Sequence, residues 1–248
     1  MGKILRLSAA ITIVLATVVF VAGLIYWVSG AYPATDTALQ AIKSDSAVFV
    51  TEENAWVTFY PSNDLQPETG FIFYPGANVD FRAYAPVMKL IAADGYFVTV
   101  LPMPLNISFF DSNAAARVQA EYPQVGNWFV GGHSLGGVTA SSYVSTHEEI
   151  QGLVLWASAP GNNALIGRES NVLLVYGSLD GLFTPAMLED AHEFLPAETQ
   201  FVPIEGGNHS QFGAYGLQNG DLAASVSPEE QWEKVAEATV EFFNGVIK

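Results

Sequence analysis

A serine between glycines is the feature of this sequence that most directly suggests chemistry. Ser134 lies in Gly132-His133-Ser134-Leu135-Gly136, after an apolar run and before a segment of helical composition. Glycines two residues before and after a serine let a strand turn sharply into a helix, so the hydroxyl is held at the apex in strained backbone. The N–H of the next residue then points to where an oxyanion would form. The pattern predicts a nucleophilic serine.

An aspartate and a histidine follow two later apolar runs. Asp180 comes after the run 172–176, and His209 comes after the run 200–204. With Ser134 they give the chain order serine, aspartate, histidine, which is the order of the α/β-hydrolase site. In this interpretation His209 takes the serine proton, while Asp180 orients the imidazole and stabilises its charged form. Each residue alone has an ordinary structural reading, but the three in this order predict a catalytic triad.

A second donor for an oxyanion is expected from residues 71–77. The apolar run 71–74 breaks at Pro75-Gly76, which leaves the backbone N–H of Ala77 free. Removing one oxyanion donor from a comparable site costs about 2.7–4 kcal/mol of transition-state stabilisation. We predict that the N–H groups of Ala77 and Leu135 form the oxyanion hole, with an ordinary strand-terminating turn as the alternative.

The elements that must position these residues alternate along the chain. Short apolar runs typical of buried strands separate amphipathic segments, which predicts a mostly parallel sheet with helices on both faces, the α/β-hydrolase fold. Ligand sites in such sheets lie at the carboxyl ends of the strands. The predicted strands are 47–50, 56–60, 71–74, 96–101, 128–131, 150–156, 172–176 and 200–204, and the predicted helices are 81–93, 112–121, 134–146, 185–194 and 228–243.

Composition excludes several classes of protein and site. The net charge of −16 and the pI of about 4.3 argue against nucleic acid as a partner, because a polyanion would be repelled. The absence of cysteine excludes disulfides, thiolate zinc sites and a cysteine nucleophile. We predict no cofactor and no metal, and the sequence does not constrain the oligomeric state.

The N-terminus predicts a membrane anchor over residues 1–30. Lys3 and Arg6 precede residues 7–28, an uncharged stretch long enough to cross a hydrocarbon core of about 30 Å. The alternative is a cleaved signal peptide, with small residues at Ser29-Gly30-Ala31. Either reading places the catalytic domain outside the cytoplasm, membrane-anchored or secreted. We expect a polar linker over 31–46 and one domain over 47–248.

From residue 47 onward the chain resembles the α/β-hydrolase superfamily. More narrowly it is similar to small serine hydrolases grouped with dienelactone hydrolases. The resemblance implies a Ser134–Asp180–His209 triad and metal-free hydrolysis. Two departures are that dienelactone hydrolases have a cysteine nucleophile, and that Pro75 stands where many relatives have histidine. The segments that carry the likeness are 74–86, 103–106, 131–137 and 205–213.

The substrate site is expected to be open and shallow. Many α/β-hydrolases insert a helical cap between the strands that precede the acid, but only residues 157–171 separate the corresponding runs here. Borders formed by this loop and by residues 101–111 favour a small or short-acyl substrate. Arg82 could hold a substrate carboxylate, or it could pair with Asp80. The predicted substrate contacts are Asn78, Arg82, Asn106, Trp156 and Phe183.

Three functions are compatible with this pattern. The first is a carboxylic ester hydrolase that works through an acyl-enzyme on Ser134. The second is an acyltransferase with the same triad, in which an alcohol replaces water as the acceptor. The third is a non-catalytic binding protein on the same fold, against which the complete triad argues.

Overall fold

The computed structural model describes residues 2–53, 56–63, 65, 67–167 and 170–247. The chain divides into two units, Met1–Ala31 and Tyr32–Lys248. The first unit is one helix, α1 (Gly2–Ser29), in which Thr12–Ser29 is long and apolar enough to cross a membrane. Signal sequences share this length and composition. Helix α1 is therefore a candidate membrane span, and its length and composition do not determine on which side of a membrane the second unit lies.

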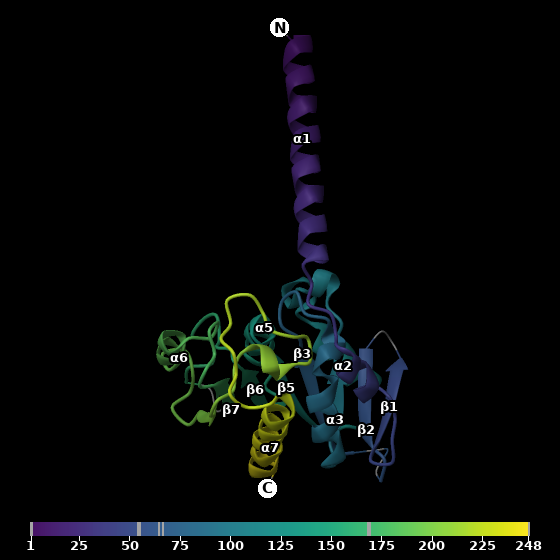
Figure 1. Ribbon diagram of the computed structural model, residues 1–248, viewed down its shortest axis with the longest axis vertical. Helices are drawn as coiled ribbons and strands as arrows, with labels where there is room; N and C mark the ends of the chain where they lie inside the picture. Colours follow the sequence, from purple (N-terminus) through teal and green to yellow (C-terminus); the bar gives the residue numbers. More distant parts are fainter. Residues whose placement is uncertain (1, 54–55, 64, 66, 168–169, 248) are drawn as a thin grey trace. The chain divides into compact units, whose positions relative to one another are not determined.

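The second unit is an eight-stranded sheet with helices packed on it (Figure 1). Its strands are β1 (Val48–Glu53), β2 (Trp56–Pro61), β3 (Thr69–Tyr74), β4 (Phe97–Val100), β5 (Asn127–His133), β6 (Ile150–Trp156), β7 (Asn171–Gly177) and β8 (Gln200–Ile204). Its α-helices are α2 (Asp36–Ala41), α3 (Ala85–Ala93), α4 (Ala114–Glu121), α5 (Leu135–Val144), α6 (Pro185–Ala191) and α7 (Pro228–Val246). Short 3-10 helices are η1 (Phe81–Tyr84), η2 (Pro104–Asn106), η3 (Ser108–Asp111) and η4 (Ser210–Phe212).

The sheet is antiparallel at one edge and parallel elsewhere. The strand order is β1-β2-β4-β3-β5-β6-β7-β8, and only the β1–β2 and β2–β4 pairs are antiparallel. The carboxyl ends of β3 to β8 therefore meet along one edge, which brings together the loops that follow these strands. This architecture confirms the predicted α/β-hydrolase fold with its mostly parallel sheet.

Helices cover both faces of the sheet. On one face α7 packs Phe242 and Phe243 against Phe129 of β5, at ring-centroid distances of 5.9 and 4.2 Å. On the other face α5 and α4 lie side by side, joined by a hydrogen bond from the Tyr143 hydroxyl to Gln119. Since both faces are covered, the central strands are apolar on both sides, and every residue of β3 is buried.

The segment expected as a linker, 31–46, differs from that expectation. From Tyr32 onward it belongs to the second unit and contains α2, in which Ala38 is fully buried. The Thr35 side chain caps α2, and the Thr35 N–H donates to the Ala214 carbonyl. Polar composition suggested a tether, but the burial of Ala38 docks this short helix onto the domain.

Candidate active site

Ser134 lies at the junction of β5 and α5 in strained backbone. Its φ of 51° and ψ of −124° lie in a region that residues other than glycine rarely adopt. A Cβ on Gly132 would fall 2.3 Å from the carbonyl carbon of Gly136, so the tight turn requires glycine there. The Ser134 N–H donates to the Trp156 carbonyl, and the Ser158 hydroxyl donates to the Ser134 carbonyl at 2.6 Å. These bonds from β6 and the loop after it hold the turn in place.

Asp180 and His209 form a buried pair in the loops after β7 and β8. His209 Nδ1 lies 2.9 Å from Asp180 Oδ2, and the two side chains are 3% and 1% exposed. The second oxygen, Oδ1, accepts from the backbone N–H groups of Leu182 and Phe183 at 2.8 and 2.6 Å. A carboxylate only accepts hydrogen bonds, so Nδ1 carries a hydrogen. In the tautomer with its hydrogen on Nδ1, the lone pair is on Nε2.

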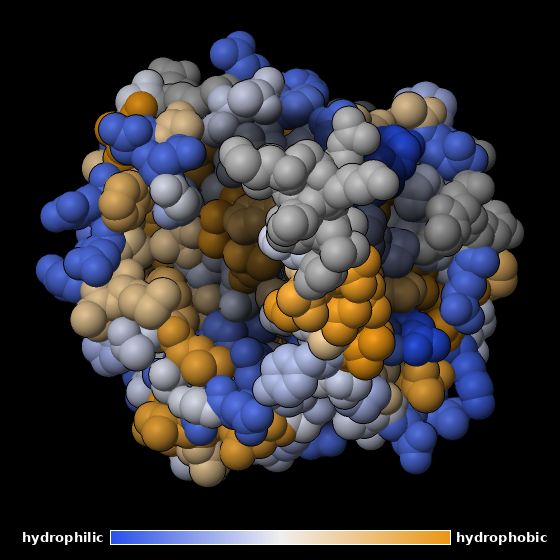
Figure 2. All heavy atoms as spheres, turned by 90° about the horizontal axis from the view of Figure 1, so that it is seen from above, coloured by the Kyte–Doolittle hydropathy of each residue, from blue (hydrophilic) through white to orange (hydrophobic). Residues whose placement is uncertain are grey.

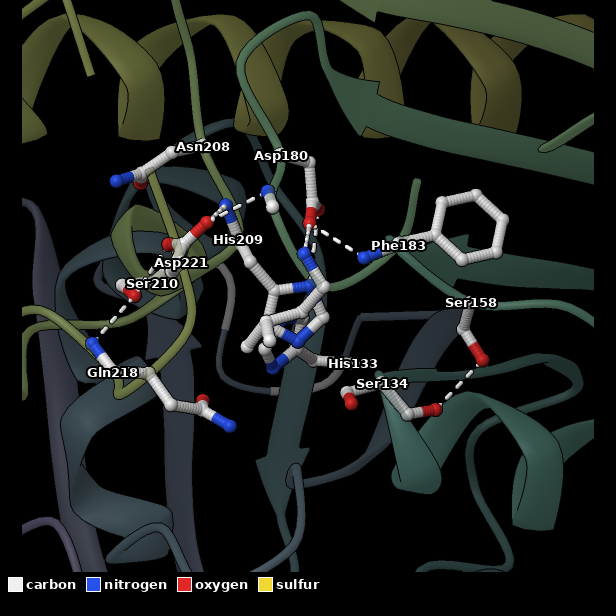
Figure 3. Close-up of polar contacts among 12 residues, drawn as sticks. His133, Ser134, Ser158, Asp180, Phe183, Asn208, His209, Ser210, Gln218 and Asp221 are labelled. Atoms are coloured by element: carbon white, nitrogen blue, oxygen red, sulfur yellow. Dashed lines mark hydrogen bonds and ion pairs between the residues drawn. The ribbon is translucent and has the colours of Figure 1, made fainter. Parts of the chain in front are cut away.

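The free nitrogen of this pair belongs to the same cavity as the serine. His209 Nε2 has no hydrogen-bond partner among the described residues, and both His209 and Ser134 line one pocket. In Figure 3 the Ser134 side chain lies on the side of the turn occupied by the two histidine rings. General-base activation of a nucleophile needs a nitrogen free to accept a proton and a hydroxyl in the same site, and this pocket contains both.

The start of α5 packs against the end of β3, next to the turn that contains Ala77. A Cβ on Gly136 would lie 2.1 Å from the Tyr74 carbonyl oxygen, so this contact admits only glycine. In the turn that follows Tyr74, the Gly76 N–H donates to the Tyr84 hydroxyl and the Asn78 N–H donates to a carbonyl. The intervening Ala77 N–H has no hydrogen bond among the described residues, which leaves it available for an oxyanion.

A second histidine, His133, lies against the pair, and sequence reasoning missed its role. Its ring centroid is 4.4 Å from that of His209, and it is fully buried. Its Nδ1 lies 2.8 Å from the Tyr84 hydroxyl, which also accepts from Gly76. Burial, with a contribution from His209, lowers the pKa of His133 well below its ordinary value of 6.5, so the ring is neutral. In the sequence, only the position of His133 directly before Ser134 indicated that its ring would lie near the site.

The pocket at Ser134 has a volume of about 510 Å³. The loop after β6 forms one border, and the segment from Leu182 through α6 to Phe194 forms the other. This differs from the expected second border at 101–111, which does not line the pocket. Its lining is largely apolar, from side chains that include Val138, Pro160, Leu182, Phe183, Met187 and Phe194.

The cover over this pocket is slight. Among the described residues between β6 and β7, 157–167 and 170, there is no helix. The same loop holds Ala157 at a φ of 45° directly after β6. A helical cap is therefore absent from this part of the described chain.

The predicted substrate contacts fall in different places. Phe183 lines the pocket. Trp156 does not line it, because its side chain is fully buried, with its ring centroid 4.5 Å from that of Phe73. Arg82 does not reach the pocket, because its guanidinium pairs with Asp80 through Nε and Nη2. Asn78 and Asn106 also lie outside the pocket lining and are joined through their backbones, with Asn78 N donating to the Asn106 carbonyl at 2.9 Å.

The described residues contain no group of three histidine, aspartate or glutamate side chains that could hold a metal ion.

A family model described as the alpha/beta hydrolase family matches residues 70–233, about two thirds of the chain. The chain belongs to the alpha/beta hydrolase family. This membership identifies it as a hydrolase of the α/β type, and the matched region contains Ser134, Asp180 and His209. No curated protein matches the sequence.

Solved structures similar to this α/β hydrolase share its fold at low sequence identity. A thermostable esterase from Pseudomonas putida is 14% identical with a TM-score of 0.60, covering 85% of this chain and 87% of its own. The esterase domain of a Rhodothermus marinus protein is 14% identical with a TM-score of 0.61, over 81% and 98%. A dienelactone hydrolase-like promiscuous phosphotriesterase from metagenomic libraries is 16% identical with a TM-score of 0.56, over 77% and 92%.

Proposed function

We propose that this α/β hydrolase cleaves carboxylic esters through an acyl-enzyme on Ser134. The observation that carries the proposal is the buried Asp180–His209 hydrogen bond, whose free Nε2 belongs to the same pocket as the serine. The strained backbone at Ser134 supports it further, because the surrounding contacts hold the serine in a conformation that it would otherwise avoid.

The reaction divides into two halves. In the first, Ser134 Oγ attacks the ester carbonyl carbon while its proton moves to His209 Nε2. The N–H groups of Ala77 and Leu135 stabilise the oxyanion. Collapse of this intermediate breaks the bond to the alcohol oxygen, which takes the proton from His209. In the second half, water loses a proton to His209 and attacks the acyl carbon. The bond from that carbon to Ser134 Oγ then breaks, Oγ takes the proton back from His209, and the acid leaves.

The proposed substrate is an uncharged ester with a small or short apolar acyl group. The largely apolar pocket supports this choice, and none of its described lining residues is lysine or arginine. A dienelactone substrate is disfavoured by the serine nucleophile and by the pairing of Arg82 with Asp80, which leaves that guanidinium outside the pocket. The resemblance to the dienelactone-hydrolase-like group does not name a substrate.

The same geometry serves an acyltransferase if an alcohol outcompetes water for the acyl-enzyme. A non-catalytic binding protein is less well supported, because it would have no use for a strained serine beside a buried histidine–aspartate pair. We further propose that α1 anchors the hydrolase to a membrane with the catalytic domain outside the cytoplasm, the alternative being secretion after cleavage. The apolar stretch Thr12–Ser29 supports both alternatives.

Labelling with a fluorophosphonate tests the nucleophile and the chemistry together. We expect covalent labelling of Ser134 and hydrolysis of p-nitrophenyl butyrate. We also expect Ser134→Ala to abolish labelling and to lower kcat by roughly 10⁶-fold, as loss of the nucleophile does in comparable enzymes. The matched control is Ser142→Ala, a serine on an exposed part of α5 whose hydroxyl donates to the Val138 carbonyl.

Adding an alcohol acceptor to the same assay separates hydrolysis from acyl transfer, through the ratio of ester to free acid formed. An unlabelled Ser134 in folded protein, or full activity in Ser134→Ala, would contradict the proposed function.

A further inference from the structure

Asp221 lies beside the histidine–aspartate pair without belonging to it. Its carboxylate is among the side chains drawn in Figure 3, in the segment between η4 and α7. Oδ1 accepts from the backbone N–H of Gly181 at 2.9 Å, and Oδ2 accepts from the N–H of Ser210 at 2.8 Å and from its hydroxyl at 2.5 Å. Gly181 follows Asp180 and Ser210 follows His209, so one carboxylate bonds to both loops at their functional residues.

Close packing shows that this bridge is part of the fold. A Cβ on Gly181 would lie 2.7 Å from the Gly220 carbonyl oxygen and 2.9 Å from the Leu222 nitrogen. Segment 220–222 therefore lies directly on the loop that carries Asp180. The His209 N–H also approaches Oδ1, at 3.4 Å.

A carboxylate suits this position because every group that faces it is a donor. Three backbone N–H groups and a hydroxyl of the two loops point at its two oxygens, and a carboxylate can accept all of them. Asparagine would place an NH₂ group against one of these donors, whichever way its amide is turned. Asp221 does not line the pocket at Ser134, so its contacts leave substrate binding to other residues.

We propose that Asp221 is a positioning residue that sets the Asp180–His209 hydrogen bond by tying the loop after β7 to the loop after β8. This inference rests on the proposed function, in which that hydrogen bond orients the general base. The loops leave separate strands, and neighbouring strands alone do not fix their tips to within the tolerance of catalysis. A misplacement of about 1 Å can cost roughly 100-fold in rate.

The test compares Asp221→Asn with Asp45→Asn in the full chain. Asp45 is a matched control, because its carboxylate also accepts two backbone N–H groups, from Ala47 and Val48, but at the β1 edge of the sheet. With p-nitrophenyl butyrate we expect Asp221→Asn to lower kcat by roughly 10- to 100-fold with KM changed less than about threefold. Asp45→Asn is expected to retain the wild-type kcat.

A spectroscopic signature separates positioning from general stability. We expect the Nδ1–H proton between His209 and Asp180 to give a low-field ¹H NMR signal, which would be assigned by its loss in Asp180→Asn. We expect Asp221→Asn to weaken or shift this signal. Ser210→Ala removes the hydroxyl that donates to Asp221 Oδ2 and accepts from the Gln218 N–H, and we expect it to give an intermediate signal and kcat. If Asp221→Asn does not fold, Ser210→Ala carries the test.

A kcat for Asp221→Asn equal to that of Asp45→Asn, with the low-field signal unchanged, would overturn the inference. So would a Ser210→Ala variant with the wild-type kcat and signal. If the wild type hydrolyses no ester and Ser134 is unlabelled, the proposed function fails instead. The NMR comparison still decides in that case whether Asp221 sets the hydrogen bond.

Discussion

At the scale of single residues, the site depends on groups that never touch a substrate. The Tyr84 hydroxyl accepts from the Gly76 N–H and is therefore oriented to donate to His133 Nδ1. This leaves the hydrogen of His133 on Nε2, which has no partner among the described residues. A buried neutral imidazole beside His209 adds bulk without adding a charge. The chain of bonds also ties the turn that carries Ala77 to β5.

His133 predicts a pH dependence of stability. Its pKa is well below 6.5 in the folded state and ordinary in the unfolded state, so the unfolded state binds more protons below about pH 6.5. The free energy of unfolding should therefore fall as the pH drops from 6.5, by up to about 1.4 kcal/mol per pH unit. Urea unfolding at pH 7.5, 6.5 and 5.5 measures this. In His133→Asn the unfolding free energy should change less steeply with pH, by up to the contribution of one proton. If the unfolding free energies of the two proteins fell in parallel with pH, the lowered pKa of His133 would be contradicted.

At the scale of elements, the contact between the start of α5 and the end of β3 creates the site. Gly136 is the point of contact, and no larger residue fits against the Tyr74 carbonyl. We expect this close approach to set the Leu135 N–H beside the turn that contains Ala77. The shape of the candidate oxyanion hole thus depends on two backbones packing without a side chain between them.

Gly136→Ala is expected to reduce both stability and activity. The added methyl overpacks the contact, which costs about 1–3 kcal/mol of unfolding free energy or more. The displaced Leu135 N–H should lower kcat by roughly 100-fold. The control is Gly245→Ala in α7, where an added Cβ meets nothing within 4 Å. It should leave kcat unchanged and raise stability by about 0.5–1 kcal/mol. Chemical unfolding and p-nitrophenyl butyrate assays provide both measurements, and equal behaviour of the two variants would disprove the argument.

At the scale of the whole molecule, charge acts on substrate choice. The net charge is −16, and Figure 2 shows hydrophilic side chains spread around the rim of one face. The charged or titratable side chains among the described residues of the pocket are Asp190 and His209. The protein as a whole and the pocket in particular therefore repel anions.

Two esters with the same number of acyl carbons but different charge test whether the protein repels anionic substrates. We expect kcat/KM for the p-nitrophenyl monoester of glutaric acid to be roughly tenfold below that for p-nitrophenyl pentanoate at low salt. Added salt should reduce the difference in kcat/KM between the two esters, because it screens exposed charges. Asp190→Asn should narrow it too, with little change for the uncharged ester. Equal rates for both esters at low salt would count against charge selection.

Much of the fold could be predicted from the sequence, because its rules are local. Apolar runs alternating with amphipathic segments indicate buried parallel strands and covering helices, and the family match bears this out. The glycines around Ser134 indicate a sharp turn from composition alone. The segment 31–46 escaped this reasoning, because a polar composition does not reveal that Ala38 is buried.

The sequence by itself determined which residues stand at the carboxyl ends of the strands, and so which side chains are candidates for the triad. Their catalytic roles stay a prediction. Only the tertiary structure decided which neighbours face the site, because that depends on strand register and on loop packing between distant segments. The tertiary structure buries Trp156 in the core and pairs Arg82 with Asp80. It also places Asp221, 41 positions after Asp180, against the loops that contain Asp180 and His209.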